Sequence, residues 1–130
     1  MIKKDIYNYL VSNIASMTTA NTWEEEAPKG KASPYYVVRS ISDSDEQKHL
    51  NAGNGSYKTG TALLQVDGMY TRNTKASAEA WKYAVIDLLG GVHGVTIGST
   101  VIELVTASAD NLTDDDYIRP TITLEIVYRR

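Results

Sequence analysis

The sequence predicts an α+β fold: a single domain, residues 1–130, in which a largely antiparallel sheet of about four strands carries two main helices on one face. Two segments have apolar residues at the spacing of an amphipathic helix, and two others alternate apolar and polar residues as half-buried strands do. A chain of 130 residues, 42% of them hydrophobic, is long enough for one core and too short for two. The order of these segments therefore predicts one layer of helices on one sheet.

The N-terminal segment is predicted to be an amphipathic helix over residues 3–17. Residues 18–34 then combine Pro, Gly and small polar residues, which favours a surface connection with Trp23 as an anchor to the core. Polar residues such as Lys4 and Asn8 occupy the outer faces of the helix, and its apolar residues are Ile2, Ile6, Leu10, Ile14 and Met17.

Two strands separated by a long polar segment are expected next. Residues 34–42 are rich in β-branched and aromatic side chains and predict the first strand. Residues 43–60 are polar, contain glycine and exceed a tight hairpin in length, so they are predicted to form a long polar loop. Residues 61–71 alternate as a strand, in which Gly68 indicates a bulge or a close contact and the core-side residues are Leu64, Val66 and Tyr70.

A second helix is predicted directly after this strand. Asn73 or Thr74 can cap its N-terminus, and Gly90 and Gly91 provide its end. Its apolar stripe consists of Ala78, Trp81, Ala84, Val85, Leu88 and Leu89.

The C-terminal third is expected to supply the remaining strands. Residues 94–108 predict one bent strand or two short strands around Gly98, and residues 109–116 predict an acidic turn. Pro120 favours the beginning of the last strand or an edge position, because proline has no N–H to donate. One face of that strand carries Ile118, Ile122, Leu124, Ile126 and Tyr128, and the other carries Thr121, Thr123, Glu125, Val127 and Arg129.

Composition argues against several classes of function. A net charge of −3 without a cluster of basic residues is not typical of a protein that holds nucleic-acid phosphates. The absence of cysteine excludes disulfides, thiolate metal sites and cysteine nucleophiles, and suits a reducing cytoplasm. No segment approaches the roughly 18 apolar residues that span a bilayer. We therefore expect a protein that is retained in the cytoplasm and has no membrane partner.

The motifs of enzymes and cofactor sites are incomplete in this sequence. Gly55 and Gly60 have the spacing of a P-loop, but Thr61 and Ala62 follow where lysine and a hydroxyl residue should bind phosphate and magnesium. The aspartate runs lack the spaced ligands of a calcium loop, and two histidines cannot form a multi-histidine metal site within one chain. No Gly-x-Ser-x-Gly pattern is present. We expect no catalytic residue, no cofactor and no metal, and hence no enzyme.

The order of elements resembles the tail terminator or tail-completion (head-tail joining) proteins of long-tailed bacteriophages. The resemblance spans nearly the whole chain: an N-terminal helix, the strand "PYYVVRS", a long polar loop, the strand "GTALLQVDGMY", the helix "SAEAWKYAVIDLLGG" and a C-terminal strand. It implies a structural virion protein at the head-tail junction that assembles in the cytoplasm of the bacterial host. Its partners would be further copies in a closed ring, commonly sixfold, the tail tube protein and the head-tail connector protein, with DNA only passing through the lumen.

Within that resemblance, a closed ring needs two different patches on each subunit, and loops or strand edges are suitable for such contacts. Six copies at −3 each give a formal charge of about −18, and like charge along the lumen would reduce adhesion of DNA phosphates. Candidate residues for the subunit or tube interface are Asp43, Asp45, Glu46, Lys48, His49, Tyr57, Thr121, Thr123, Glu125 and Arg129, and candidates for the lumen are Asp114, Asp115 and Asp116.

Three alternatives to these assignments stay open at the level of sequence. Residues 43–60 could be a flexible excursion, and the polar face of the last strand could simply be solvated. The protein could be another phage neck or baseplate component with the same small domain. It could also be a small ligand-binding module or enzyme, which should bury a preformed apolar pocket.

Overall fold

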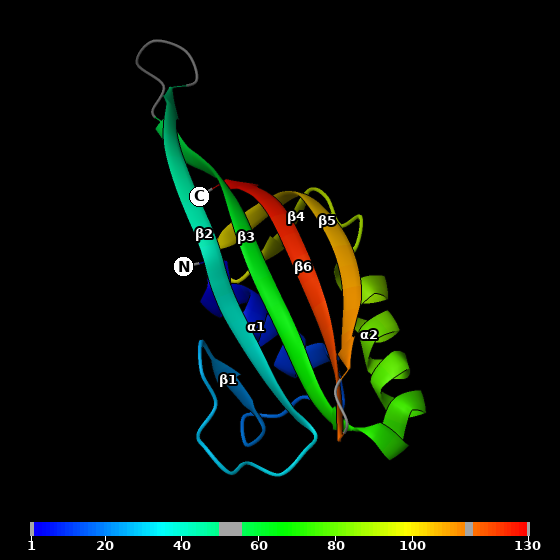
Figure 1. The fold of residues 1–130 in the computed structure, drawn as a ribbon. Helices are drawn as coiled ribbons and strands as arrows, with labels where there is room; N and C mark the ends of the chain where they lie inside the picture. The colour runs from blue at the N-terminus through cyan, green and yellow to red at the C-terminus, as the bar shows by residue number, and fades with distance from the viewer. Residues whose placement is uncertain (1, 50–55, 114–115, 130) are drawn as a thin grey trace.

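The computed structural model describes residues 2–49, 56–113 and 116–129, and it has an α+β fold with two helices on one face of a six-stranded sheet (Figure 1). The sheet order is β1-β2-β3-β6-β5-β4, and only the β1–β2 pair is parallel among these strands. The elements are α1 (Ile2–Asn13), β1 (Thr22–Glu24), β2 (Tyr35–His49), β3 (Ser56–Thr71), the 3-10 turn η1 (Arg72–Thr74), α2 (Lys75–Leu89), β4 (Val95–Ile97), β5 (Thr100–Thr113) and β6 (Tyr117–Arg129).

The strand count is the part of the predicted fold that is wrong, while the class, the single domain and the largely antiparallel pairing are confirmed. β1 and β4 have three residues each, which is too short for alternation to be visible in the sequence. The predicted break at Gly98 is confirmed, because this residue has a φ of 61° and connects β4 to β5. Pairing of such short strands depends on the longer strand beside them.

The helix-covered face of the sheet holds the core, and the alternation in the sequence identified it. In β3, Leu64, Val66 and Tyr70 are buried as predicted, and α2 buries Ala78, Trp81, Val85 and Leu89 from its predicted stripe. The predicted inner face of β6 is buried along its whole length: Ile118, Ile122, Leu124, Ile126 and Tyr128.

The predicted long loop at residues 43–60 is mostly a β-hairpin. β2 continues to His49 and β3 starts at Ser56, with ladder pairs such as Asp45↔Gly60 and Lys48↔Tyr57. This hairpin arm, residues 43–49 and 56–60, pairs with β6 only at its base, where Thr59 and Gly60 lie opposite Arg129 and Tyr128, and its outer part projects beyond β6 (Figure 1). A ribbon that projects past the core has no apolar face to maintain, so its sequence lacks the alternation that indicates a strand.

The N-terminal helix ends at Asn13, four residues earlier than predicted. Ile14 and Met17 still pack in the core from the turn that follows, so apolar spacing continues past the last helical residue.

The carboxylate of Asp5 accepts a hydrogen bond of 2.7 Å from Thr100 Oγ1, and a Cβ on Gly98 would lie 2.2 Å from Asp5 Oδ1. This contact fixes α1 against the β4–β5 turn.

Gly68 is a close-contact position, as its place in the predicted strand indicated. A Cβ on this residue would lie 2.8 Å from Trp81 Cζ3, so α2 packs directly on the backbone of β3.

The β3–β6 ladder is interrupted between Asp67↔Thr121 and Tyr70↔Ile118. Pro120 lies in this gap, near the beginning of β6, where no N–H is needed; the alternative edge position is wrong, because β6 is a central strand.

The predicted ends of α2 are confirmed in position but not in the expected cap. Thr74 is the residue before the first helical turn, yet its side chain makes no capping bond to the helix. Its Oγ1 instead donates to the carbonyl oxygen of Thr71 at 2.8 Å, which closes the 3-10 turn. At the other end Gly91 has a φ of 77°, and the Gly90 N–H bonds the Ile86 carbonyl.

Candidate functional site: the open face of the sheet

The face of the sheet that carries no helix forms a polar surface, which we call the open face. Neighbouring strands place their outward-pointing residues in rows across it, because cross-strand pairs share a face in an antiparallel sheet. One row contains Val37, Asp67, Thr121 and Asp110 in register. The open face consists of Tyr35, Val37 and Arg39 in β2, Gln65, Asp67 and Met69 in β3, Arg119, Thr121 and Thr123 in β6, and Ser108, Asp110 and Leu112 in β5.

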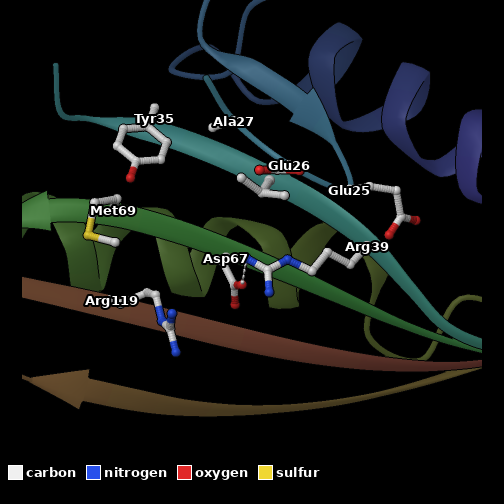
Figure 2. A pocket seen from close by; sticks show the side chains of 9 residues that line it. Glu25, Glu26, Ala27, Tyr35, Arg39, Asp67, Met69 and Arg119 are labelled. Carbon is white, nitrogen blue, oxygen red and sulfur yellow. Dashed lines mark ion pairs between the residues drawn. The ribbon is translucent and has the colours of Figure 1, made fainter. Parts of the chain in front are cut away.

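A hollow of about 430 Å³ lies on this face beside the starts of β2 and β6, where residues 25–27 overhang β2. Figure 2 shows the Arg39 and Arg119 guanidinium groups on either side of the Asp67 carboxylate. Two positive groups thus flank one negative group on the floor of the hollow. The lining residues are Glu25, Glu26, Ala27, Tyr35, Val37, Arg39, Asp67, Met69 and Arg119.

Asp67 is the buried charge of this hollow, with only 4% of its surface exposed. Arg39 Nη2 lies 3.4 Å from one of its carboxylate oxygens, and Gln65 Nε2 donates to both oxygens at 3.0 Å. A buried carboxylate without such partners would be strongly destabilising. The pairing therefore lets a charged residue sit on the floor of the hollow.

Three other polar atoms of the open face are buried without a hydrogen-bond partner in the part of the chain that the structure describes. They are Arg39 Nε, Arg119 Nε and Thr121 Oγ1. Most buried polar groups in proteins have a partner, and an unpaired one lowers stability. The two arginines line this hollow and Thr121 lies beside Arg119 on β6, so this part of the open face has polar groups that the described chain leaves unpaired.

Glu25 fixes the overhanging segment to the rest of the domain. It has a positive φ of 68°, its N–H bonds the Val38 carbonyl at 2.8 Å, and its carboxylate accepts from Lys3 Nζ at 2.8 Å and the Ser40 N–H at 2.9 Å. The hydrogen bond from Lys3 and then the one from the Ser40 N–H hold the pKa of Glu25 below its usual value. Glu25 thus links α1, β2 and the rim of the hollow.

The structure brings together only part of the predicted interface. Thr121 and Thr123 line a second hollow on the open face, of about 580 Å³, which adjoins the first through Arg119. Glu125 is exposed farther along β6, and Arg129 pairs with Glu103 with 3.3 Å between Nε and Oε1. The polar face of the last strand is thus a continuous part of the open face.

The hairpin residues lie far from this hollow, at the opposite end of the long strands (Figure 1). Asp43 is exposed and accepts a hydrogen bond from the hydroxyl of Tyr128, which ties the base of the arm to β6. The structure gives strand positions for Asp45, Glu46, Lys48, His49 and Tyr57, and their side chains are outside its described part.

The predicted lumen residues are only partly within the described chain. Asp114 and Asp115 lie outside the described residues. Asp116 is exposed in the turn before β6, and its carbonyl accepts a hydrogen bond of 3.0 Å from the Arg72 N–H. Its position beside η1 places it at the same end of the sheet as the hollow.

Sequence reasoning missed Arg39, Asp67 and Arg119 as members of one site. The available signal is alternation: Asp67 directly follows the core-side residue Val66, which places it on the outer face of the strand. The three residues are separated by 28 and 52 positions in the chain, so only the strand register brings them together.

A metal centre and a membrane span find no support in the described part of the chain. Residues 2–49, 56–113 and 116–129 contain no group of three or more potential metal-binding histidine and carboxylate side chains. None of the described helices combines the length and apolar character that crossing a membrane requires.

Comparisons with known proteins give a likeness in fold. No protein-family model matches the chain, and no curated protein matches it. The chain is similar to one in the solved structure of the virion of a native gene transfer agent (GTA) particle, with a TM-score of 0.62. The likeness covers 98% of this chain and 94% of that chain at 15% sequence identity. At this identity the two chains share a fold.

Proposed function

We propose that this protein is a structural virion subunit that forms a ring on the end of a phage-type tail tube, stops tube growth and offers the surface for head-tail joining. The observation that carries the proposal is the likeness in fold to a chain of a gene transfer agent virion over nearly the full length of both chains. Fold likeness alone does not assign function. The order of elements that resembles tail terminators supports the more specific role.

The two lateral edges of the sheet support assembly into a ring. At the β2 edge, β1 pairs only with Tyr36 to Val38, and no described strand lies beside residues 41–49 on that side. At the β5 edge, β4 pairs only with residues 100–102, and no described strand lies beside residues 106–113. Each subunit thus has two different partly unpaired edges, which suits a heterologous interface that closes after a fixed rotation.

The proposed partners are further copies of the chain in a ring, sixfold by the resemblance to tail terminators, together with a tail tube protein and a head-tail connector protein. The site of action would be the head-tail junction of the virion, after assembly in the host cytoplasm. No chemical step is part of this role, so the protein would act without a catalytic residue or cofactor.

Light scattering and negative-stain microscopy of the purified protein, alone and with purified tail tubes, test this function. We expect rings, either free or at one end of each tube, and tubes that no longer elongate. A protein that stays monomeric even with tubes, and leaves tube growth unchanged, would contradict the proposal. Rings that bind elsewhere on the particle would favour the alternative of another neck or baseplate component.

A small ligand-binding module or enzyme is the remaining alternative, since the hollow on the open face could hold a ligand. The charged, solvent-open lining of the hollow counts against it, because small-molecule sites are usually concave and mostly apolar. A specific small molecule that copurifies with the protein and occupies this hollow would support this alternative over the ring.

A further inference from the structure

The Arg119 side chain is the group on the open face whose bonding is least complete. Its Nε is buried without a hydrogen-bond partner in the described chain, and no ion pair joins it to a described carboxylate. Arg39, across the Asp67 carboxylate, uses one terminal nitrogen in its ion pair and also has a buried Nε without a partner. Because Arg119 is only partly buried and has no hydrogen bond or ion pair with a described residue, its terminal N–H groups are available for a further acceptor.

We propose that the hollow beside Arg119 is a binding site for a carboxylate on an extended acidic segment of a partner protein. A guanidinium presents parallel N–H donors that match the two oxygens of a carboxylate. Thr121 adds an unpartnered hydroxyl next to Arg119 on the same strand face. A bound carboxylate would accept hydrogen bonds from the terminal N–H groups of Arg119.

The charges around the hollow favour a singly charged carboxylate over a phosphate. Asp67 lies on the floor, and Glu25 and Glu26 line the rim, so three carboxylates accompany the two arginines. Like charges at this distance repel, and the repulsion grows with the charge of the ligand. A phosphate, which carries up to two negative charges near neutral pH, would meet more repulsion here than a carboxylate does.

The shape of the open face favours an extended segment. The hollow of about 430 Å³ adjoins the one of about 580 Å³, because Arg119 lines both, and the second continues along β6 past Thr121 and Thr123. Together they form a groove that follows the strands. An extended chain could place one acidic side chain at Arg119 and lay the next residues over the threonines.

The position of the groove separates this partner from contacts of the hairpin arm. The hollow lies beside Tyr35 and Met69, where β2 begins and β3 nears its end, whereas the arm is at the other end of these strands (Figure 1). Within the proposed function, on which the identity of the partner rests, the groove would receive a neighbouring virion protein. The carboxylate site itself depends only on the geometry of the single chain.

Titration with a pair of capped peptides tests the site on the full chain. The probes are SDTES, which carries two carboxylates, and the neutral SNTQS, with binding followed by the NMR signals of the arginine Nε–H groups. We expect SDTES to shift the Arg119 signal at millimolar concentration and SNTQS to leave it unchanged. Equal shifts with both peptides, or no shift of the Arg119 signal with SDTES, would overturn the proposal.

Variants distinguish the effect of the parallel N–H donors of Arg119 from the effect of its positive charge. Arg119→Gln should weaken SDTES binding by about tenfold or more, and Arg119→Lys should recover only part of it. Lys75→Gln, which removes an exposed positive charge at the start of α2 on the other side of the sheet, is the matched control and should bind as the unaltered protein does. Circular dichroism of each variant checks the fold. Equal binding by Arg119→Gln and the control would contradict the assignment.

Inorganic phosphate is the second probe, and it distinguishes the class of anion. Phosphate should bind more weakly than SDTES, and tighter binding of phosphate would overturn the preference for carboxylates. If the chain does not form rings, the proposed function is contradicted but the carboxylate site is not, because the peptide titration measures the single chain in solution. Peptide binding without rings would leave the carboxylate site in place.

Discussion

Asp67 and Gly68 are neighbours in the sequence but belong to opposite faces of the sheet, and one face is built from apolar packing while the other carries charged groups. Gly68 lies under Trp81, whose ring centroid is 5.0 Å from that of Tyr36 in a closely packed aromatic cluster. Asp67 lies in an open hollow between two arginines with unpartnered donors. The helix-covered face is held mainly by apolar packing within the chain, and its buried indole nitrogen, Trp81 Nε1, has no partner among the described residues. The open face instead carries charged groups that line hollows reachable by another molecule.

From this difference we expect substitutions on the helix-covered face to affect mainly stability and substitutions on the open face to affect mainly binding. Packing on the helix-covered face is dense, so a change in side-chain volume is felt directly in the free energy of unfolding. Arg39, which pairs with the buried Asp67 on the open face, is itself partly exposed, so loss of this ion pair should have a smaller effect on folding. The following changes test the comparison, beginning with the largest expected effect.

Trp81→Ala should be the most destabilising substitution. Trp81 is 3% exposed and contacts Tyr36, Tyr70 and the backbone at Gly68, so truncation would leave a large cavity. We expect a loss of about 3–5 kcal/mol in the free energy of unfolding, measured by urea denaturation. Tyr83→Ala, on the exposed side of the same helix at 56% exposure, is the control and should change stability little. Similar losses in both variants would contradict the packing assigned to α2.

Gly68→Ala should come next, because the new methyl group would collide with Trp81. The ideal Cβ lies 2.8 Å from Cζ3, and the ring is held by the tyrosines around it. We expect a loss of about 1–3 kcal/mol by the same measurement. In a double-mutant cycle with Trp81→Leu, the combined loss should be smaller than the sum of the two single losses. Additive losses would show that the methyl group does not meet the indole.

Asp67→Asn tests the open face. The amide can keep a hydrogen bond with Gln65 but loses the charge that faces Arg39, so we expect a loss of only about 1 kcal/mol. The same change should strengthen binding of the peptide SDTES, because it removes a negative charge from the floor of the hollow. Asp87→Asn, at an exposed position on α2, is the control. A loss as large as that of Trp81→Ala would remove the distinction between the faces.

Glu25→Gln should have the smallest effect, and that effect should depend on pH. The pKa of Glu25 is lowered from its ordinary value of 4.5, so the stabilisation by the ionised form is complete above that value and is lost as the pH falls through the lower folded-state pKa. Because Glu25 is largely exposed, we expect about 0.2–1 kcal/mol at neutral pH.

Thermal unfolding from neutral to acidic pH measures this effect. Glu25→Gln should lose less stability on acidification than the unaltered protein, and the neighbouring Glu26→Gln should behave like the unaltered protein. An identical pH dependence for both variants would contradict the role of Glu25 at the rim.

Most of the fold could be predicted because its main elements carry a period in the sequence. Leu64 and Val66 on β3, and the five inner residues of β6, alternate with polar residues and are buried as expected. β1, β4 and the hairpin arm could not be predicted in the same way. The first two are too short for a period, and the arm has no core beneath it to impose one.

The candidate site was predictable only in part, for a related reason. Thr121 and Thr123 follow from the alternation of β6, and both line the open face. Arg119 adjoins them on the same strand but carries no pattern that distinguishes it from any other surface arginine. Its significance comes from a hollow whose walls belong to β2, β3 and the segment at residues 25–27.

Burial requires apolar side chains at the period of each element, so the residues that face the core can be assigned from the amino-acid sequence. The close contact at Gly68 and the ends of α2 can be assigned from it as well, since glycine is favoured where a side chain would collide or a helix stops. The proximity of Arg39, Asp67 and Arg119 is visible only in the folded chain, because hydrogen-bond register between distant strands sets which outward-facing residues become neighbours.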